Sequence, residues 1–149
     1  MADGNLAQHE ADVLLAMEKH RVHDDALIFP TRGGRAEAEL QSPDGRNKFL
    51  LYVGRGCAEY RNVSMHNRTG ENVVLARLDI GGPAHRNPDD EEIPCPHLYL
   101  YSEVDEYKWA IPLPPECFTP ASDPYRTLDE FMSYCNITKP PRIQRGLFP

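Results

Sequence analysis

The chain has 149 residues, a length typical of one domain. Hydrophobic residues make up 40% and charged residues 26%, an ordinary globular composition that excludes general disorder and a fibrous protein. Uncharged apolar runs such as residues 49–53 are far shorter than the roughly 20 residues of a membrane-spanning helix. The formal net charge of −7 disfavours non-specific binding to nucleic acid and favours a basic partner.

No apolar segment typical of a secretory signal follows the amino terminus, so we expect a cytoplasmic protein without membrane association. Cysteines outside the secretory pathway usually stay reduced, so we expect free thiols. These cysteines are widely spaced, at Cys57, Cys95, Cys117 and Cys135. Structural zinc sites use ligand pairs at knuckle spacing, which this sequence lacks, so we predict neither a metal nor another cofactor.

We predict a single domain of the α+β class over residues 1–149. A helix over residues 1–22 opens it, with Asn5 as the expected N-cap. The apolar residues expected on one face of this helix are Leu6, Val13, Leu14 and Met17.

An alternation of apolar and polar residues then replaces the helical period and predicts an antiparallel sheet over residues 26–111. We expect about six to seven strands in a curved sheet or small barrel. The expected strands are 35–40, 49–53, 57–64, 73–79, 97–101 and 108–111. The glycines at 54 and 56 predict a hairpin loop between two of them.

A second helix is predicted over residues 123–136, because Asp123 and Pro124 suit its first positions. Its apolar stripe follows helical spacing and consists of Leu128, Phe131, Met132 and Cys135. Two prolines at 140 and 141 prevent the helix from continuing, so residues 137–149 are expected to form an extended tail.

Side chains able to carry chemistry concentrate between residues 77 and 109. Period two places Leu75, Arg77 and Asp79 on one face of their strand. Strands that follow one another in sequence are usually neighbours, so the same face should receive side chains from the next two strands. The residues expected together on this face are Arg77, Asp79, His97, Tyr99, Tyr101 and Lys108.

The loop over residues 81–90 joins two of these strands and is rich in turn formers. We expect His85 to lie over the sheet face beside His97. An acidic run at the end of this loop is expected in solvent, where it can contact a basic partner. The run consists of Asp89, Asp90, Glu91 and Glu92.

A signature reading RLDxGGPxHxNPD…IPCPH…KWA lies in this part of the chain. Together with residues 131–137, it resembles a family of small bacterial proteins, a domain of unknown function also found in mobile elements. The resemblance implies a single domain of bacterial or phage origin. Family members read P-H-x-N-P-D-G and H-x-H-x-Y where this chain has Asp90 and Tyr99. The missing second histidine weakens a two-histidine acid–base or metal mechanism.

We favour a small acidic interaction protein of a bacterium, phage or mobile element, for example an inhibitor of a bacterial defence system. Its partner would be a basic protein, because acidic surfaces compete for the basic grooves of nucleic-acid-binding enzymes. The residues assigned to binding are Asp89, Asp90, Glu91, Glu92, Tyr99 and Trp109.

The alternative is a metal-independent, toxin-like ribonuclease with RNA as its substrate. His97 would then act as general acid or base, while Arg77 and Lys108 would hold phosphate. The full predicted catalytic set is His85, His97, Arg77, Tyr101 and Lys108. The two hypotheses differ on whether the protein is an enzyme, and the sequence supports both.

Overall fold

One large sheet contains most of the strands in the computed structural model, which describes residues 6–59, 61–70, 73–120 and 123–146. Its strands are β1 (Lys19–Arg21), β3 (Arg35–Gln41), β4 (Lys48–Arg55), β5 (Val63–Thr69), β6 (Val73–Ile80), β9 (His97–Leu100), β10 (Ala110–Pro112) and β11 (Ile137–Lys139). Their spatial order is β10-β9-β6-β5-β4-β3-β1-β11. Every neighbouring pair is antiparallel except β1 and β11.

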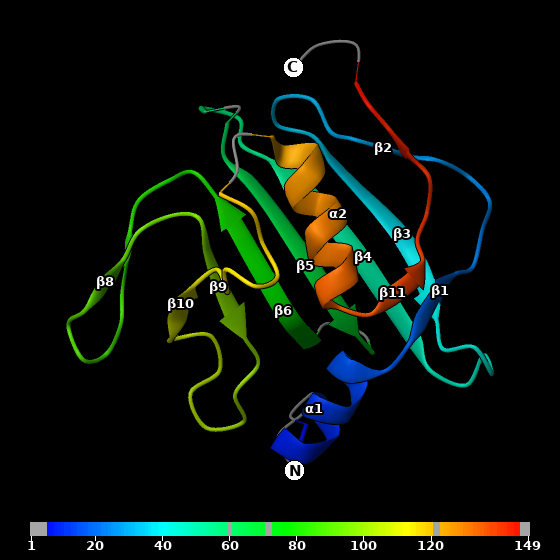
Figure 1. Ribbon diagram of the computed structural model, residues 1–149, viewed down its shortest axis with the longest axis horizontal. Coiled ribbons are helices and arrows are strands. Elements are labelled where there is room, and N and C mark those ends of the chain that lie inside the picture. The colour runs from blue at the N-terminus through cyan, green and yellow to red at the C-terminus, as the bar shows by residue number, and fades with distance from the viewer. Residues whose placement is uncertain (1–5, 60, 71–72, 121–122, 147–149) are drawn as a thin grey trace.

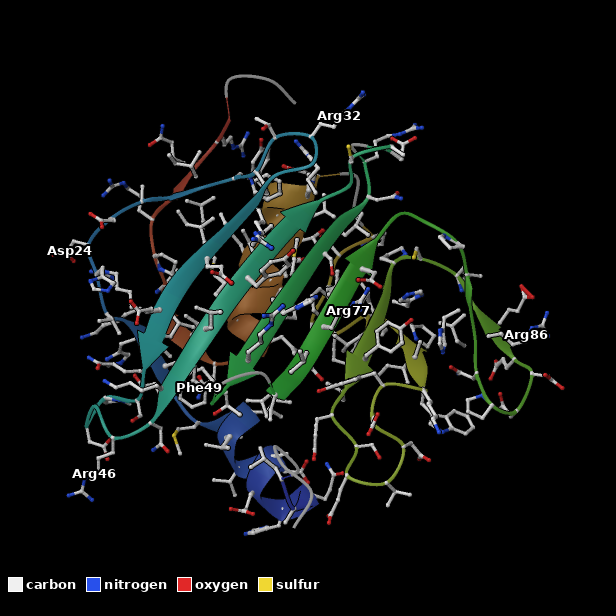
Figure 2. All side chains as sticks on the ribbon, turned by 180° about the vertical axis from the view of Figure 1, so that it is seen from behind. Asp24, Arg32, Arg46, Phe49, Arg77 and Arg86 are labelled. Carbon is white, nitrogen blue, oxygen red and sulfur yellow. The ribbon has the colours of Figure 1, made fainter. Side chains whose placement is uncertain are left out.

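Two helices and two short ribbons complete the described fold. They are α1 (Gln8–Ala16), α2 (Pro124–Tyr134), β2 (Leu27–Ile28) paired with β12 (Ile143–Gln144), and β7 (His85–Arg86) paired with β8 (Glu92–Ile93). Helix α2 lies across one face of the sheet and α1 lies at one end (Figure 1). Neither described helix covers the opposite face, which we call the open face (Figure 2). Neither is long and apolar enough to cross a lipid bilayer.

The face beneath α2 holds the main hydrophobic core. Because side chains alternate along a strand, Leu51 and Val53 of β4 and Met65 of β5 all point to this face, where they are fully buried. Helix α2 begins after Asp123, whose carboxylate accepts a hydrogen bond from the backbone N–H of Tyr125. The predicted apolar stripe is confirmed, since all four of its members are buried: Leu128, Phe131, Met132 and Cys135.

The α+β class and the largely antiparallel sheet are confirmed, but the sheet does not close into a barrel, and its eight strands exceed the predicted six to seven. The difference arises partly at one edge, where β1 and β11 come from segments expected as helix and as extended tail. They pair in parallel, with Lys19 opposite Ile137, and so join the two ends of the described chain.

The N-terminal helix is shorter than the predicted 1–22, and its expected cap, Asn5, lies outside the described residues. Its expected apolar face is wrong in part, because Val13 is 46% exposed whereas Ala11 is 2% exposed. The helix is short because the chain from Lys19 onward pairs with two strands as β1.

The hairpin predicted between β4 and β5 is present, because these two strands pair as antiparallel neighbours, but its loop does not lie at residues 54–56. Strand β4 continues through Arg55, whose backbone N–H donates to the carbonyl oxygen of Gly34 at 3.0 Å. The following strand, predicted over 57–64, begins later and runs further, as β5. Because β5 extends to Thr69, His66 is part of this strand.

Candidate functional site

Two rows of residues, all polar except Gly54, cross the open face. They align because residues paired across neighbouring strands point to the same side of a sheet. The first row is Arg35, Gly54, Ser64, Asp79 and His97, from β3, β4, β5, β6 and β9. The second row is Glu37, Tyr52, His66, Arg77 and Tyr99, from the same strands. Figure 2 shows Arg77 among the side chains of this face.

A chain of hydrogen bonds links the two rows through Ser64 and His66. The Ser64 hydroxyl donates to Asp79 Oδ1 at 2.9 Å, so the 3.0 Å contact between Ser64 Oγ and His66 Nε2 has the imidazole as donor. Arg68 Nη2 donates to His66 Nδ1 at 3.0 Å. Serine, histidine and aspartate therefore meet in the wrong order for a nucleophilic triad, in which the imidazole accepts the serine proton.

The surroundings of His66 favour its neutral form. Burial, followed by the nearby charges of Arg77 and Arg68, lowers the pKa of His66 from 6.5 to about 4. Its ring also lies 4.7 Å from the ring of Tyr52, measured between centroids. His66 is thus a fixed, neutral hydrogen-bonding group at neutral pH.

This lowered pKa predicts a loss of stability on acidification. Between pH 6.5 and about 4 the unfolded chain binds the His66 proton and the folded chain does not, so the free energy of unfolding falls as pH drops through this window. We expect the wild type to lose up to about 3 kcal/mol more than His66→Gln between these limits. Urea unfolding across this pH range measures the difference. Parallel pH profiles for the two proteins would contradict the assignment.

Asp79 is the centre of the polar cluster on the first row. Its Oδ1 accepts from Arg77 Nε at 2.9 Å as well as from Ser64, and its Oδ2 lies 3.5 Å from His97 Nε2. The Arg77 guanidinium also lies over the ring of Tyr99, 5.6 Å from its centroid. Oδ1 of the carboxylate therefore accepts from two neighbouring donors.

His97 is an internal side chain. It is 3% exposed, and its Nδ1 donates to the carbonyl oxygen of Ile93 at 3.1 Å. Since a carbonyl only accepts, Nδ1 carries the proton and Nε2 faces Asp79. The His97 imidazole therefore links β9 to β8 and lies beside Asp79 of β6. In this position it is out of reach of a large substrate.

The β7–β8 hairpin covers the end of β9 and β10 from the open side. The His85 ring lies 5.1 Å from that of Tyr99 and 6.3 Å from that of His97, and His85 Nε2 donates to the Lys108 carbonyl oxygen at 2.7 Å. Buried Asn87 makes two further bonds with β10. Its Nδ2 donates to the carbonyl oxygen of Ala110 at 3.0 Å, and its Oδ1 accepts from the Ala110 N–H at 2.8 Å.

Four residues of the expected polar face do lie together: Arg77, Asp79, His97 and Tyr99. Tyr101 does not join them, because β9 ends at Leu100, and the Tyr101 hydroxyl instead bonds the backbone of Leu6. Lys108 precedes β10 and is exposed. Leu75, expected on the same face as Arg77, is buried in the core because a β-bulge shifts the pairing of β5 with β6.

The predicted acidic run is exposed at the tip of the β7–β8 hairpin, as Asp89, Asp90, Glu91 and Glu92. Arg86 lies 2.6 Å from Glu92 and 3.9 Å from Asp90, so this arginine pairs with two of the four carboxylates. Trp109 and Ile111, on the adjoining edge of the sheet, are each 40% exposed.

No group of three or more histidine, cysteine, aspartate or glutamate side chains is placed to hold a metal ion among the described residues. Cys95 Sγ lies 3.7 Å from the His97 ring nitrogens, and burial raises the pKa of this thiol, which disfavours the thiolate.

A family model matches residues 6–137, a range that includes both helices and every strand of the two polar rows. The chain belongs to DUF6978, a family of unknown function. No curated protein and no solved structure matches the chain. Membership in DUF6978 assigns no activity, so the function has to be argued from the geometry above.

Proposed function

We propose that this DUF6978 protein is a small interaction protein that binds a basic surface of a partner protein. The binding surface, which we call the acidic edge, comprises the hairpin tip at residues 89–92, the β9–β10 loop at 103–106, and the adjoining Trp109 and Ile111. Both loops project at the β10 side of the sheet (Figure 1). The observation that carries the proposal is a set of exposed carboxylates on an anchored hairpin beside an exposed tryptophan.

This combination suits protein recognition. Trp109 and Ile111 offer exposed apolar side chains of the kind that supplies most interface energy, and the carboxylates of the neighbouring hairpin steer a basic partner. The bonds of Asn87 and His85 to the β10 side hold the hairpin before binding, which lowers the entropy cost of association.

The ribonuclease alternative has weaker support, because its intended acid–base group is buried. His97 is 3% exposed in its side chain, and Tyr99, the neighbouring candidate, is 8% exposed. The proposal also includes three expectations from the sequence. The protein is cytoplasmic, it comes from a bacterium or mobile element, and its partner site is the basic groove of a defence enzyme.

The test compares two charge reversals of equal size. Tagged wild type, Asp89→Lys/Glu91→Lys and the control Asp24→Lys/Asp25→Lys are expressed in a bacterium, purified at low salt, and their bound proteins quantified. Asp24 and Asp25 are exposed, and Asp24 lies far from Arg86 of the hairpin (Figure 2). We expect a stoichiometric partner with the wild type and the control, and roughly tenfold less with the hairpin variant.

Higher salt and Trp109→Ala should both weaken the same complex, and total cellular RNA should stay intact. Equal retention by the hairpin variant and the control would refute the acidic edge. RNA fragmentation that disappears in His97→Ala would instead establish the ribonuclease.

A further inference from the structure

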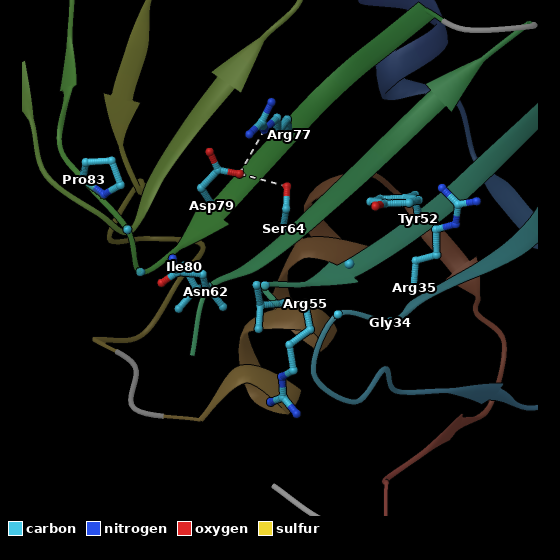
Figure 3. Close-up of a pocket in the computed structure, with 16 residues that line it drawn as sticks. Gly34, Arg35, Tyr52, Arg55, Asn62, Ser64, Arg77, Asp79, Ile80 and Pro83 are labelled. Carbon is cyan, nitrogen blue, oxygen red and sulfur yellow. Dashed lines mark hydrogen bonds and ion pairs between the residues drawn. The ribbon is translucent and has the colours of Figure 1, made fainter. Parts of the chain in front are cut away.

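A groove of about 740 Å³ lies on the open face, where β4, β5 and β6 meet neighbouring loops (Figure 3). Small-molecule sites usually measure about 300 to 1,000 Å³, so the groove has room for a ligand of nucleotide size. A Cβ atom on Gly54 would lie 2.5 Å from the Tyr52 hydroxyl oxygen, so the glycine lets the Tyr52 ring lie along the groove. The polar side chains that line it are Arg35, Tyr52, Arg55, Asn62, Ser64, Arg77 and Asp79.

Two of the three arginines that line the groove supply it with positive charge, because the guanidinium of the third, Arg55, is buried and lies over the Phe29 ring. Arg77 donates from Nε to Asp79, and its guanidinium lies over the Tyr99 ring. Its two terminal nitrogens have no hydrogen-bond partner in the described part of the chain. The Arg35 side chain is exposed and has no hydrogen bond or ion pair with any described residue. Their strands lie three strand spacings apart, roughly 14 Å between backbones. A ligand that contacts both must therefore be larger than one phosphate ion.

The same groove offers groups that suit a base. The side-chain amide of Asn62 has no hydrogen-bond partner among the described residues, and such an amide can both donate to and accept from a base edge. Tyr52 adds an aromatic side chain, the usual platform for bases on single-stranded nucleic acid, and the Arg68 guanidinium lies over its ring, 4.8 Å from the centroid.

We infer that this groove binds a nucleotide, either free or within single-stranded RNA. Arg35 and Arg77 contact its phosphates, and Asn62 and Tyr52 contact its base. The net charge of the chain is compatible with this site, because the one carboxylate of the groove, Asp79, is already paired with Arg77 and faces His97. The inference does not rest on the partner proposed for the acidic edge, which lies on a different part of the molecule.

The test uses a charge-matched pair of variants. Arg35 begins β3, and Arg46 lies in the turn after it, at the other end of the same β3–β4 hairpin (Figure 2). Binding of a fluorescein-labelled single-stranded RNA of about twelve nucleotides is followed by anisotropy, with unlabelled AMP and inorganic phosphate as competitors. Arg35→Glu should weaken RNA binding about tenfold and Arg46→Glu less than about twofold. The uncharged change Tyr52→Leu should also weaken it, with folding of all variants checked by urea unfolding.

Competition by AMP but not by phosphate would identify the nucleotide itself as the ligand. RNA binding that AMP does not displace, but that Arg35→Glu weakens, would place the nucleotide within an RNA strand. Equal weakening by Arg35→Glu and Arg46→Glu would overturn the inference in favour of general charge attraction. Absence of RNA binding to the wild type, together with no binding of AMP in a direct titration, would overturn it outright.

Discussion

Replacement of Lys19 by methionine should lower the free energy of unfolding by about 3 kcal/mol. Lys19 is fully buried, and its Nζ donates to the carbonyl oxygens of Leu15, Met17 and Cys135, each at 2.8 Å. The first two carbonyls belong to the end of α1 and the third follows α2, so one ammonium group satisfies the C-terminal ends of both helices. Burial lowers its pKa to about 8, which still leaves it protonated at neutral pH.

Methionine preserves the length and apolar stem of the side chain but removes the donor from all three hydrogen bonds, of which the bond to Cys135 is buried and the other two are part-buried. No opposing carboxylate is removed with it, so nothing compensates the loss. The matched control is Lys139→Met on the adjoining strand β11, where the side chain is exposed. Urea unfolding of both variants at pH 7 measures the difference. A midpoint for Lys19→Met equal to that of the control would contradict the bridging role.

The sequence predicts the central strands and α2 well, because their alternation and their helical stripe are local signals. It misses β1 because residues 18–21 are all polar and charged, the usual composition of an exposed helix end. Their structural role depends on β11 and on the carbonyl of Cys135, more than a hundred positions away. A buried lysine with a distant acceptor leaves no periodic signal in its own segment.

The candidate site shows the same division. Arg77, Asp79, His97 and Tyr99 could be placed together because their strands are antiparallel neighbours with clear alternation. His66 was missed because the predicted strand stopped at residue 64. The polar residue Asn67 occupies a fully buried position and interrupts the apolar alternation of β5. Val63, Met65 and Thr69 share one face if the strand is allowed to continue through Asn67. That longer strand would have included His66 on its opposite face.

The Asn87→Ala variant should destabilise the β7–β8 hairpin by about 2–3 kcal/mol. The Asn87 side chain makes the backbone hydrogen bonds that a neighbouring strand would otherwise make with β10. Its amide makes both hydrogen bonds to Ala110, which is 1% exposed, and the sequence indicates only a turn at this asparagine. Alanine leaves a buried N–H and a buried carbonyl unpaired. Asn87→Asp keeps the acceptor for the Ala110 N–H but places a carboxylate oxygen against the Ala110 carbonyl, so its destabilisation should be at least as large as that of Asn87→Ala.

Hydrogen exchange of the Ala110 amide measures this directly, with faster exchange expected in Asn87→Ala than in Glu91→Ala, an exposed change on the same hairpin. Unchanged exchange would show that other contacts hold the hairpin.

Asn87→Ala also separates the position of the hairpin from its charge at the acidic edge, because all four carboxylates of the tip remain. If partner binding falls in Asn87→Ala although the charge is intact, the anchored hairpin is required for recognition. If binding persists, electrostatic attraction is sufficient and the anchoring serves only the sheet.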